Sequence, residues 1–305
     1  MSQLIVLGSV NADHVLQVPS FPRPGETLHG RNYQIIPGGK GANQAVAAAR
    51  LNADIGFIAC VGDDGFGQNI RGVFADDGID ISAVHMIENT PTGIAMIQVS
   101  DCGENSICIA AAANDALTAE VVNQHCAQIA AANYLLMQLE TPLAGIEYAA
   151  SIAKANGTKV ILNPAPARAL PDALLAMVDI ITPNETEAEV LTGVAVTDAD
   201  SAAKAAQALH DKGIAIVMIT LGSKGVYISQ QGTGKIIPGF KVTATDTTAA
   251  GDTFNGAFVT GLLEGKAIED AVVFAHGAAA ISVTRFGAQT SIPSRDEVEQ
   301  FITAQ

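Results

Sequence analysis

Short apolar runs rich in β-branched residues alternate with longer alanine-rich stretches along most of the chain. The apolar runs predict strands over residues 4–7, 54–61, 134–139, 159–162, 178–182 and 214–221. They lack a strict alternation of polar and apolar positions, which is typical of parallel strands buried on both faces. The alanine-rich stretches predict helices over residues 42–51, 117–132, 199–212 and 252–264. This order predicts an α/β fold, a doubly wound three-layer sandwich with a mostly parallel central sheet.

Two regions break this rhythm, at residues of about 11–37 and 92–110. The first is polar and holds Pro19, Pro22 and Pro24, whereas the second alternates like an antiparallel hairpin. We expect a small β-sheet lid, inserted in two pieces into a single α/β domain that spans residues 1–305. Long surface loops are the alternative. Because a small sheet with an apolar face needs a partner, we also expect a homodimer through the lid.

Composition narrows the classes of function. Apolar residues make up 49% of the chain and charged residues 15%, which excludes a disordered protein. The net charge of −15 disfavours binding to nucleic acid or to an anionic membrane surface. No apolar run reaches the ~18–20 residues that span a bilayer, and the first residues lack the basic region of a signal peptide. We therefore expect a cytoplasmic protein.

The cysteines show no spacing that is typical of a zinc site or a redox pair. They are Cys60, Cys102, Cys108 and Cys126. We expect them to be small buried side chains in a reducing compartment.

Glycine clusters occur at residues 38–43, 62–67, 222–225 and 249–252. None fits G-x-x-x-x-G-K-[ST], which excludes a P-loop nucleotide triphosphatase. The cluster at residues 62–67 has neither the glycine order nor the following acid of a dinucleotide site, which disfavours a Rossmann-type oxidoreductase.

The segment over residues 246–256 combines small residues with Asp252 at the start of a predicted helix. Backbone N–H groups at such a position form a ready anion site. A carboxylate there would repel a phosphate unless a hydroxyl lay between them, giving its proton to Asp252 while attacking phosphorus. A base beside a group of amides is what in-line phosphoryl transfer requires. An ordinary N-capping aspartate is the alternative.

Polar side chains also follow other predicted strands. Asn184 and Glu187 face one side of a helix start, where they fit either a hydrated Mg²⁺ beside nucleotide phosphates or a simple helix cap. Asn11, Asp13 and Glu140 lie where strands end, at the edge of the sheet where open α/β folds bind ligands. Amides and carboxylates without aromatic partners suit a polyhydroxylated ligand, although each residue also fits an ordinary turn.

Several ordered segments together resemble the ribokinase–fructokinase carbohydrate kinase family over nearly the full length. They are residues 8–13 (GSVNAD), 38–45 (GGKGANQA), 137–140 (MQLE), 163–166 (NPAP), 182–187 (TPNETE), 220–222 (TLG) and 246–256 (DTTAAGDTFNG). The resemblance implies transfer of a phosphoryl group from ATP to the 5-hydroxyl of D-ribose, with Asp252 as the general base. It implies an anion hole at Ala249, Ala250 and Gly251.

The same resemblance implies the binding residues. Sugar contacts are implied for Asn11, Ala12, Asp13, Gly39, Lys40, Gly41, Ala42, Asn43, Glu140 and Asp252. ATP contacts are implied for Asn184, Thr220, Leu221, Gly222, Ser223, Lys224, Gly225, Gly251, Asp252 and His276. Glu187 would organise Mg²⁺ through water. An activating monovalent cation, usually K⁺, is implied at Asp246, Thr248, Ser282, Arg285, Gly287 and Ser291.

Some points stay open at this stage. The family signature has glycine where Ala249 stands. An N–H donor survives this change, so we expect the anion hole to be intact, and its geometry to depend on whether this position needs a positive φ. His276 fits packing in an alanine-rich helix as well as nucleotide binding. The rival functions are a kinase for fructose, deoxyribose or a nucleoside such as adenosine, and a non-catalytic sugar-binding protein on the same fold.

Overall fold

A computed structural model describes residues 2–102, 104–230 and 232–305. The strands are β1 (Leu4–Leu7), β2 (Asn11–Val18), β3 (Arg31–Gly38), β4 (Ile55–Gly62), β5 (Val84–Ile87), β6 (Gly93–Ser100), β7 (Asn105–Ala110), β8 (Tyr134–Met137), β9 (Lys159–Leu162), β10 (Ile180–Ile181), β11 (Ile216–Thr220), β12 (Val226–Gln230) and β13 (Thr233–Ile237). The helices are α1 (Lys40–Arg50), α2 (Gly65–Asp76), α3 (Ala119–Asn123), α4 (Cys126–Ala131), α5 (Leu143–Asn156), α6 (Asp172–Leu175), α7 (Glu185–Thr192), α8 (Ala199–His210), α9 (Ala250–Leu263), α10 (Ile268–Ser282) and α11 (Arg295–Thr303).

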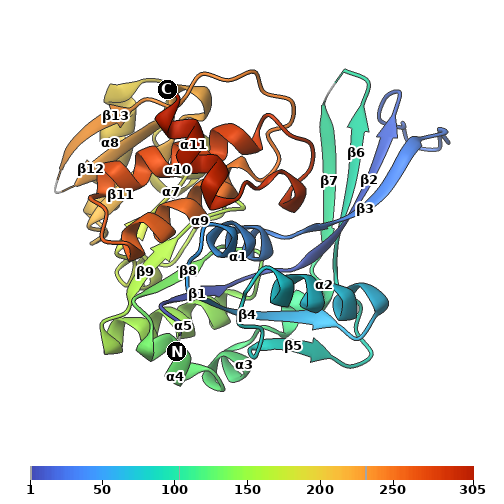
Figure 1. Cartoon of the computed structure of the whole chain (residues 1–305), viewed down its shortest axis with the longest axis horizontal. Helices are drawn as coiled ribbons and strands as arrows, with labels where there is room; N and C mark the ends of the chain where they lie inside the picture. The colour runs from blue at the N-terminus through green and yellow to red at the C-terminus, as the bar shows by residue number, and fades with distance from the viewer. Residues whose placement is uncertain (1, 103, 231) are drawn as a thin grey trace.

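The central sheet has nine strands in the order β13-β12-β11-β10-β9-β8-β1-β4-β5. Neighbours from β11 through to β5 are parallel, and β12 and β13 add an antiparallel edge. Helices cover both faces (Figure 1). The predicted α/β sandwich with a mostly parallel sheet is therefore confirmed.

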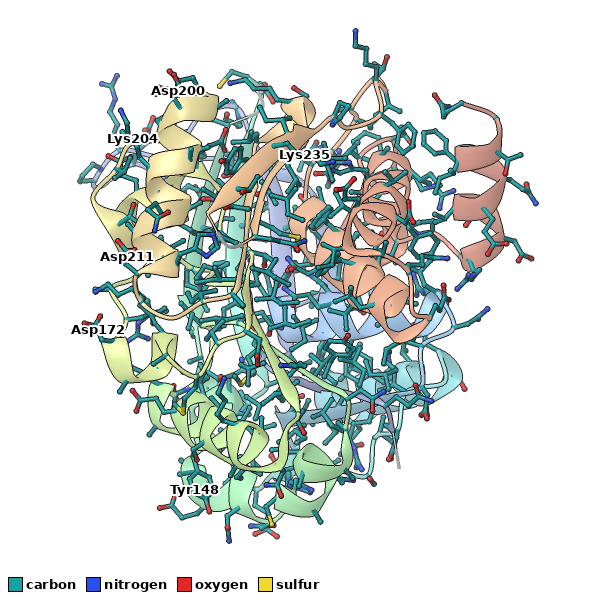
Figure 2. All side chains as sticks on the ribbon, turned by 90° about the vertical axis from the view of Figure 1, so that its left-hand side faces the viewer. Tyr148, Asp172, Asp200, Lys204, Asp211 and Lys235 are labelled. Atoms are coloured by element: carbon teal, nitrogen blue, oxygen red, sulfur yellow. The ribbon has the colours of Figure 1, made fainter. Side chains whose placement is uncertain are left out.

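Each face of the sheet has its own hydrophobic core because side chains alternate along every strand. In β1, Leu4 and Val6 pack against α1, α2, α9 and α10, while Ile5 and Leu7 pack against the helices from α3 to α8. The helices likewise bury one face and expose the other. In α8, Ala202, Ala205, Ala206 and Leu209 are buried at helical spacing. The charged side chains Asp200, Lys204 and Asp211 lie on the outside of the molecule (Figure 2).

A second sheet of four strands, in the order β3-β2-β6-β7, stands away from the sandwich (Figure 1). Strand β2 is antiparallel to β3 and parallel to β6, and β7 is antiparallel to β6. The expected small inserted sheet is confirmed, and the alternative of long surface loops is wrong for these segments. Every residue of β7 is exposed, so this sheet has an uncovered surface in the single chain.

Two details differ from the sequence-based expectation. The helix predicted over residues 117–132 is split into α3 and α4, because the N–H groups of Gln124 and His125 bond three residues back, to Val121 and Val122. This tighter 3₁₀ spacing ends the first helix at a polar run. Of the cysteines, only Cys60 is buried. Cys102 and Cys108 lie on or beside the uncovered small sheet, and Cys126 begins α4 at the surface.

Within the described ranges, no helix has both the length and the apolar character needed to cross a bilayer.

Candidate functional site

The predicted site residues gather where the parallel strands end. The segments that follow β1, β8, β9, β10 and β11 supply Ser9, Glu140, Asn163, Asn184 and the loop after Thr220. The N-terminal ends of α1 and α9 face the same region, because Asn43 and Gln44 of α1 contact Asp252 of α9. This is the edge at which open α/β sheets bind ligands.

Tight backbone packing places the start of α1. Gly39 has a φ of 90°, and a Cβ there would lie 2.8 Å from the Asn11 nitrogen. A Cβ at Gly41 would lie 2.5 Å from backbone atoms of Gly8 and Ser9. Only glycine fits at these two positions. The glycines of residues 38–43 therefore bring α1 against the ends of β1 and β2.

Glu140 occupies the N-terminal end of α1. Its Oε2 accepts hydrogen bonds from the Lys40 backbone N–H at 3.0 Å and from Ser9 Oγ at 2.5 Å. A carboxylate at a helix N-terminus is stabilised by the helix dipole. Ser9 was not predicted from the sequence. Its Oγ also accepts from the Gly41 N–H at 3.3 Å, so it links the end of β1 to α1.

The Asp252 carboxylate is buried and held on both oxygens. Asn43 Nδ2 donates to Oδ2 at 3.0 Å, and Gln44 Nε2 donates to Oδ1 at 2.9 Å. Burial raises the pKa of Asp252 above its ordinary value, against the opposing effects of Lys40 and of these two hydrogen bonds. A capping aspartate would bond its own helix, whereas this carboxylate bonds α1. Asp252 is thus a buried acid with raised proton affinity, aligned by neutral donors.

Lys40 stands among several acids. Burial alone would lower its pKa, but the carboxylates of Asp252, Glu140 and Glu187 raise it overall, so Lys40 is a cation at neutral pH. Burial raises the pKa of Asp13 to about 7, helped by the negative charges of Glu140 and Asp252. Near neutral pH, Asp13 can therefore either donate or accept a hydrogen bond.

Two predicted sugar ligands keep a buried oxygen without a partner among the residues that the structure describes. These atoms are Asp13 Oδ1 and Asn43 Oδ1. Buried polar atoms normally have a hydrogen-bond partner, so both oxygens are suited to bind a ligand. Asn11 Oδ1 accepts from Asn114 Nδ2 at 2.8 Å, which holds the Asn11 side chain in place.

Ala12 and Ala42 take part differently. Ala12 lies between Asn11 and Asp13 on β2 and therefore points to the opposite face of the small sheet. The Ala42 N–H donates to the Ser9 carbonyl at 2.9 Å. Ala12 and Ala42 shape the site by backbone packing.

The predicted anion hole is the first turn of α9. Ala250 N–H donates weakly to the Thr247 carbonyl at 3.3 Å, whereas Gly251 and Asp252 lie in the turn whose amides lack partners within the helix. Apart from its chain neighbours and its own helix backbone, a Cβ on Gly251 would meet no atom of the described residues within 4 Å. The helix start is thus open toward the space beside Asp252.

Ala249 precedes this helix with a φ of 58°. The position therefore does require a positive φ, the condition that the sequence left open. A non-glycine residue in this conformation costs about 1–2 kcal/mol. The chain keeps an alanine here and so holds local backbone strain directly beside the candidate base.

The chain matches the pfkB family carbohydrate kinases over residues 1–295. It belongs to this family. A ribokinase of Haemophilus influenzae is 60% identical over 299 residues, which cover 98% of both chains. The crystal structure of a ribokinase from Thermotoga maritima has a TM-score of 0.91 and 39% identity, covering 99% of this chain and 100% of that one. An Arabidopsis thaliana ribokinase, solved in complex with ribose and ATP, has a TM-score of 0.90 and 33% identity, covering 99% and 98%.

In this carbohydrate kinase, the predicted nucleotide residues lie side by side. Asn184 pairs with Thr220 in an isolated bridge, and the Thr220 N–H donates to the Pro183 carbonyl at 2.9 Å. Gly222–Lys224 form a short 3₁₀ helix, which Leu221 precedes. Gly225 follows with a φ of 107°, and a Cβ there would lie 2.1 Å from the Ile237 carbonyl oxygen. Only glycine fits at that position.

Asn184 and Glu187 form a capping box at the start of α7. Asn184 Oδ1 accepts from the Glu187 N–H, and Glu187 Oε2 accepts from the Asn184 N–H, each at 2.8 Å. The helix cap that the sequence offered as an alternative is therefore observed. However, Glu187 is buried, and this burial raises the pKa of its carboxyl group. The Asn184 N–H and Lys40 act in the opposite direction and lower it. Its second oxygen is not needed for the cap.

His276 of α10 is buried against the Phe254 ring, with 5.5 Å between the ring centroids. Burial lowers the pKa of His276 to about 4, so the ring is neutral. In the described part of the chain, neither ring nitrogen makes a hydrogen bond of normal geometry, although the Pro238 backbone lies close enough to oppose the effect of burial on the pKa.

The loops predicted to hold a monovalent cation lie together. Asp246 accepts hydrogen bonds from the Thr248 N–H and Oγ1, and from the Gly287 N–H at 2.9 Å. These bonds lower the pKa of Asp246 although burial opposes them. The Arg285 guanidinium pairs with Glu297 at 2.5 Å. Ser282 Oγ and Ser291 Oγ donate to the carbonyls of Ala279 and Ala288.

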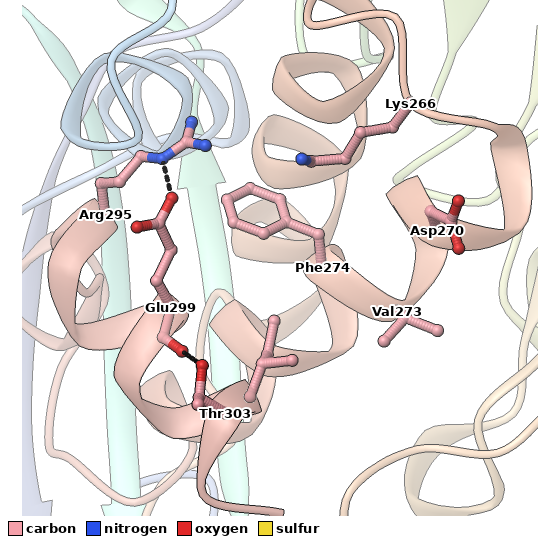
Figure 3. A pocket seen from close by; sticks show the side chains of 8 residues that line it. Lys266, Asp270, Val273, Phe274, Arg295, Glu299 and Thr303 are labelled. Carbon is pink, nitrogen blue, oxygen red and sulfur yellow. Dashed lines mark hydrogen bonds and ion pairs between the residues drawn. The ribbon is translucent and has the colours of Figure 1, made fainter.

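Two other observations bear on the location of the site. In the described ranges, no group of three or more His, Cys, Asp or Glu side chains is arranged to hold a metal ion. A surface cavity of about 420 Å³ lies between α10 and α11 (Figure 3). Its lining residues are Lys266, Asp270, Val273, Phe274, Arg295, Glu299, Ile302 and Thr303. It contains none of the predicted site residues.

Proposed function

We propose that this chain transfers the γ-phosphoryl group of ATP to the 5-hydroxyl of D-ribose. The buried Asp252 carboxylate, fixed by two amide donors beside an open helix N-terminus, carries this proposal. The full-length similarity to ribokinases, one of them solved with ribose and ATP, supports the two substrates. A non-catalytic sugar-binding protein would need neither the base nor the open amides.

The proposed step is an in-line displacement. The 5-hydroxyl oxygen attacks the γ-phosphorus while its proton moves to a carboxylate oxygen of Asp252. The bond between the γ-phosphorus and the bridging oxygen breaks, and ADP leaves with its electron pair. The first-turn amides of α9, from Ala249 to Asp252, face the charge on the transferring group, with Lys40 as a nearby cation. Positioning and electrostatic stabilisation are expected to supply most of the rate.

The sugar is proposed to lie over the end of β1, between the small sheet and α1. Asn11, Asp13 and Asn43 would bind its hydroxyls, helped by Lys40, Glu140 and the backbone at Gly39. The unpartnered Oδ1 atoms of Asp13 and Asn43 support this placement. The small sheet would act as a lid that excludes water during transfer.

The nucleotide is proposed to lie along the loops after β10 and β11. Asn184, the turn at residues 221–225, Gly251 and His276 would contact it. The carboxylate oxygen of Glu187 outside the capping box fits the oxygen ligands that Mg²⁺ takes through water. When bound, Mg²⁺ would neutralise phosphate charge.

Glu187→Gln is expected to raise the Mg²⁺ concentration needed for half-maximal activity, because a neutral amide attracts the hydrated ion less. The amide oxygen can still accept from the Asn184 N–H, so the helix cap and the melting temperature should persist. Titrating activity with MgCl₂ at saturating ribose measures the effect. An unchanged titration curve would remove Glu187 from the Mg²⁺ site.

We also propose that K⁺ activates the enzyme at the loops of Asp246 and Gly287. The Asp246 carboxylate ties these loops together next to Ala249, and backbone carbonyls suit a weakly charged cation. A cation there would fix the conformation of residues 246–249, which leads into the first turn of α9.

A homodimer through the small sheet is proposed as well. By register, Ile35 and Met96 share one face of this sheet, and Tyr33 lies on the same face of β3. Their exposed fractions are 49%, 56% and 57%, an apolar surface that monomers rarely leave uncovered. Sedimentation of the whole chain is expected to give twice the monomer mass, and a monomer at micromolar concentration would contradict the dimer.

The deciding experiment is a coupled ADP-release assay with MgATP, with and without K⁺. D-Ribose, 2-deoxyribose, D-fructose and adenosine are the acceptors. Ribose-dependent turnover that rises with K⁺ is the expected result. Turnover with another acceptor but not with ribose would contradict ribose as the substrate and leave the role of Asp252 as the base unchanged. No turnover despite ribose binding would favour the non-catalytic alternative. The use of ATP fits a cytoplasmic location.

A further inference from the structure

The candidate base accepts a hydrogen bond from a chain of buried side-chain amides. Gln44 and Gln138 are 0% and 1% exposed, and Asn163 is 7% exposed. Their side chains come from α1 and from the ends of β8 and β9, which lie far apart in the sequence. They meet directly beneath Asp252.

The orientation of the Gln44 amide is set by its partners. Gln138 Nε2 donates to Gln44 Oε1 at 2.6 Å, so the oxygen of Gln44 faces β8. Its nitrogen then donates one hydrogen to Asp252 Oδ1 at 2.9 Å and the other to Asn163 Oδ1 at 3.0 Å. An amide nitrogen has two hydrogens, and both are used.

The chain of hydrogen bonds continues to the anion hole. Asn163 Nδ2 donates to the Thr182 carbonyl at 3.0 Å, and Thr182 Oγ1 donates to Asn255 Oδ1 at 2.7 Å. Asn255 Nδ2 in turn donates to the Gly251 carbonyl at 2.8 Å. One continuous path therefore joins the Asp252 carboxylate to the backbone of the helix turn that would face the phosphate.

We propose that Gln44 is a positioning residue for the phosphoryl transfer, which holds the Asp252 carboxylate in the orientation that receives the sugar proton. This inference rests on the proposed function of Asp252 as the base. Asn43 also bonds Asp252 but has a free oxygen for the sugar. Gln44 has neither a free donor nor solvent exposure, so its influence on the reaction passes through Asp252.

The chemical reason is that Asp252 is buried and must still ionise. Burial raises its pKa, and the Gln44 hydrogen bond counters this because an N–H donor stabilises the charged form. Without that donor, Asp252 would hold its proton to higher pH, and its carboxylate would be held by Asn43 on one oxygen alone. Both changes lower the fraction of enzyme that is ready to accept the sugar proton.

Gln44→Met tests the proposal because methionine has a similar length and no donor. We expect kcat to fall about 10–100-fold, with the KM for ribose within about threefold of the wild type. The acid limb of the kcat/KM profile should move up by about one pH unit, as loss of one hydrogen bond to a carboxylate predicts. Gln138→Met keeps the two donors of Gln44 but removes the hydrogen bond that fixes the Gln44 amide. It should change kcat and the acid limb in the same direction as Gln44→Met, by smaller amounts.

Thr158→Val is the matched control. Thr158 is a buried side chain at the opposite end of the sheet, where its Oγ1 donates to the carbonyls of Ile129 and Ala132. It should lower the melting temperature and leave the pH profile unchanged. If Gln44→Met behaves like this control, with stability lost and the acid limb unmoved, the positioning role is wrong.

A titration of the Asp252 carboxyl carbon by NMR keeps the test independent of turnover. A higher pKa in Gln44→Met than in the wild type supports the proposal, and equal values contradict it. Should Gln44→Met fail to fold, Gln138→Met decides the matter by the same two measurements. Absence of ribose-dependent ADP release from the wild-type chain would instead contradict the proposed function.

Discussion

Asp252→Asn is expected to lower kcat for ribose phosphorylation by about 10²–10⁴-fold, the usual contribution of a general base. The asparagine keeps the size of the side chain and removes its basicity. Ribose affinity should persist, because the hydrogen bonds can be re-formed. Among the described residues Asn43 Oδ1 has no partner, so the Asn43 amide can turn, accept from the new NH₂ group and present its own NH₂ group to a sugar oxygen. Gln44 can continue to donate to the oxygen that remains.

The stability of this variant gives a second readout with a definite sign. Because the folded-state pKa of Asp252 is raised, ionisation of this carboxyl disfavours folding. The wild type therefore loses stability relative to Asp252→Asn as pH rises from the unfolded value of ~3.9 through the folded pKa, and the difference is constant above it. At neutral pH the variant should melt at the same or a higher temperature.

The measurements are ADP release, ribose binding by calorimetry and thermal melting across pH. Asp270→Asn is the matched control, because Asp270 stands at the corresponding third position of α10 and is exposed. It should leave kcat unchanged. Near-normal turnover in Asp252→Asn would show that another group takes the sugar proton.

The order of strands and helices in this fold could be predicted from local pattern. Strand β9 matches its predicted range, and Gly38 and Gly39 precede α1. The split between α3 and α4 could not be predicted in the same way, because residues 117–132 are compatible with one long helix. Both short helices pack against α5, a tertiary contact that the local sequence does not show.

The candidate base was predictable because its carboxylate, its small neighbours and its helix start lie within one segment. Its supporting residues were not. Gln44 reaches Asp252 across 208 positions of sequence, and Asn114 reaches Asn11 across 103. A lone glutamine or asparagine carries no local signal for such a contact. The backbone strain at Ala249 could not be predicted either, because it is seen only in the positive φ of that residue.

Gly251→Ala is expected to give a protein that is more stable and nearly inactive. Gly251 is the second residue of α9 with a helical backbone, and a Cβ there would meet no protein atom within 4 Å. Alanine should therefore raise stability by up to about 1 kcal/mol through helix propensity. A Cβ in a helix tilts toward the N-terminus, so the new methyl would stand over the amides of the anion hole. A phosphoryl group displaced by about 1 Å loses about 10²-fold in rate.

Gly72→Ala in α2 separates the two effects, because a Cβ at Gly72 also meets no protein atom within 4 Å and the position is exposed. It should gain similar stability and keep full activity. The comparison requires thermal melting and kcat/KM for ATP in both variants. Full activity in Gly251→Ala would mean that the phosphoryl group does not approach this turn, and the anion hole would have to be sought elsewhere. Loss of activity only at Gly251 would show that the empty space above the helix start is kept for the substrate at the expense of helix stability.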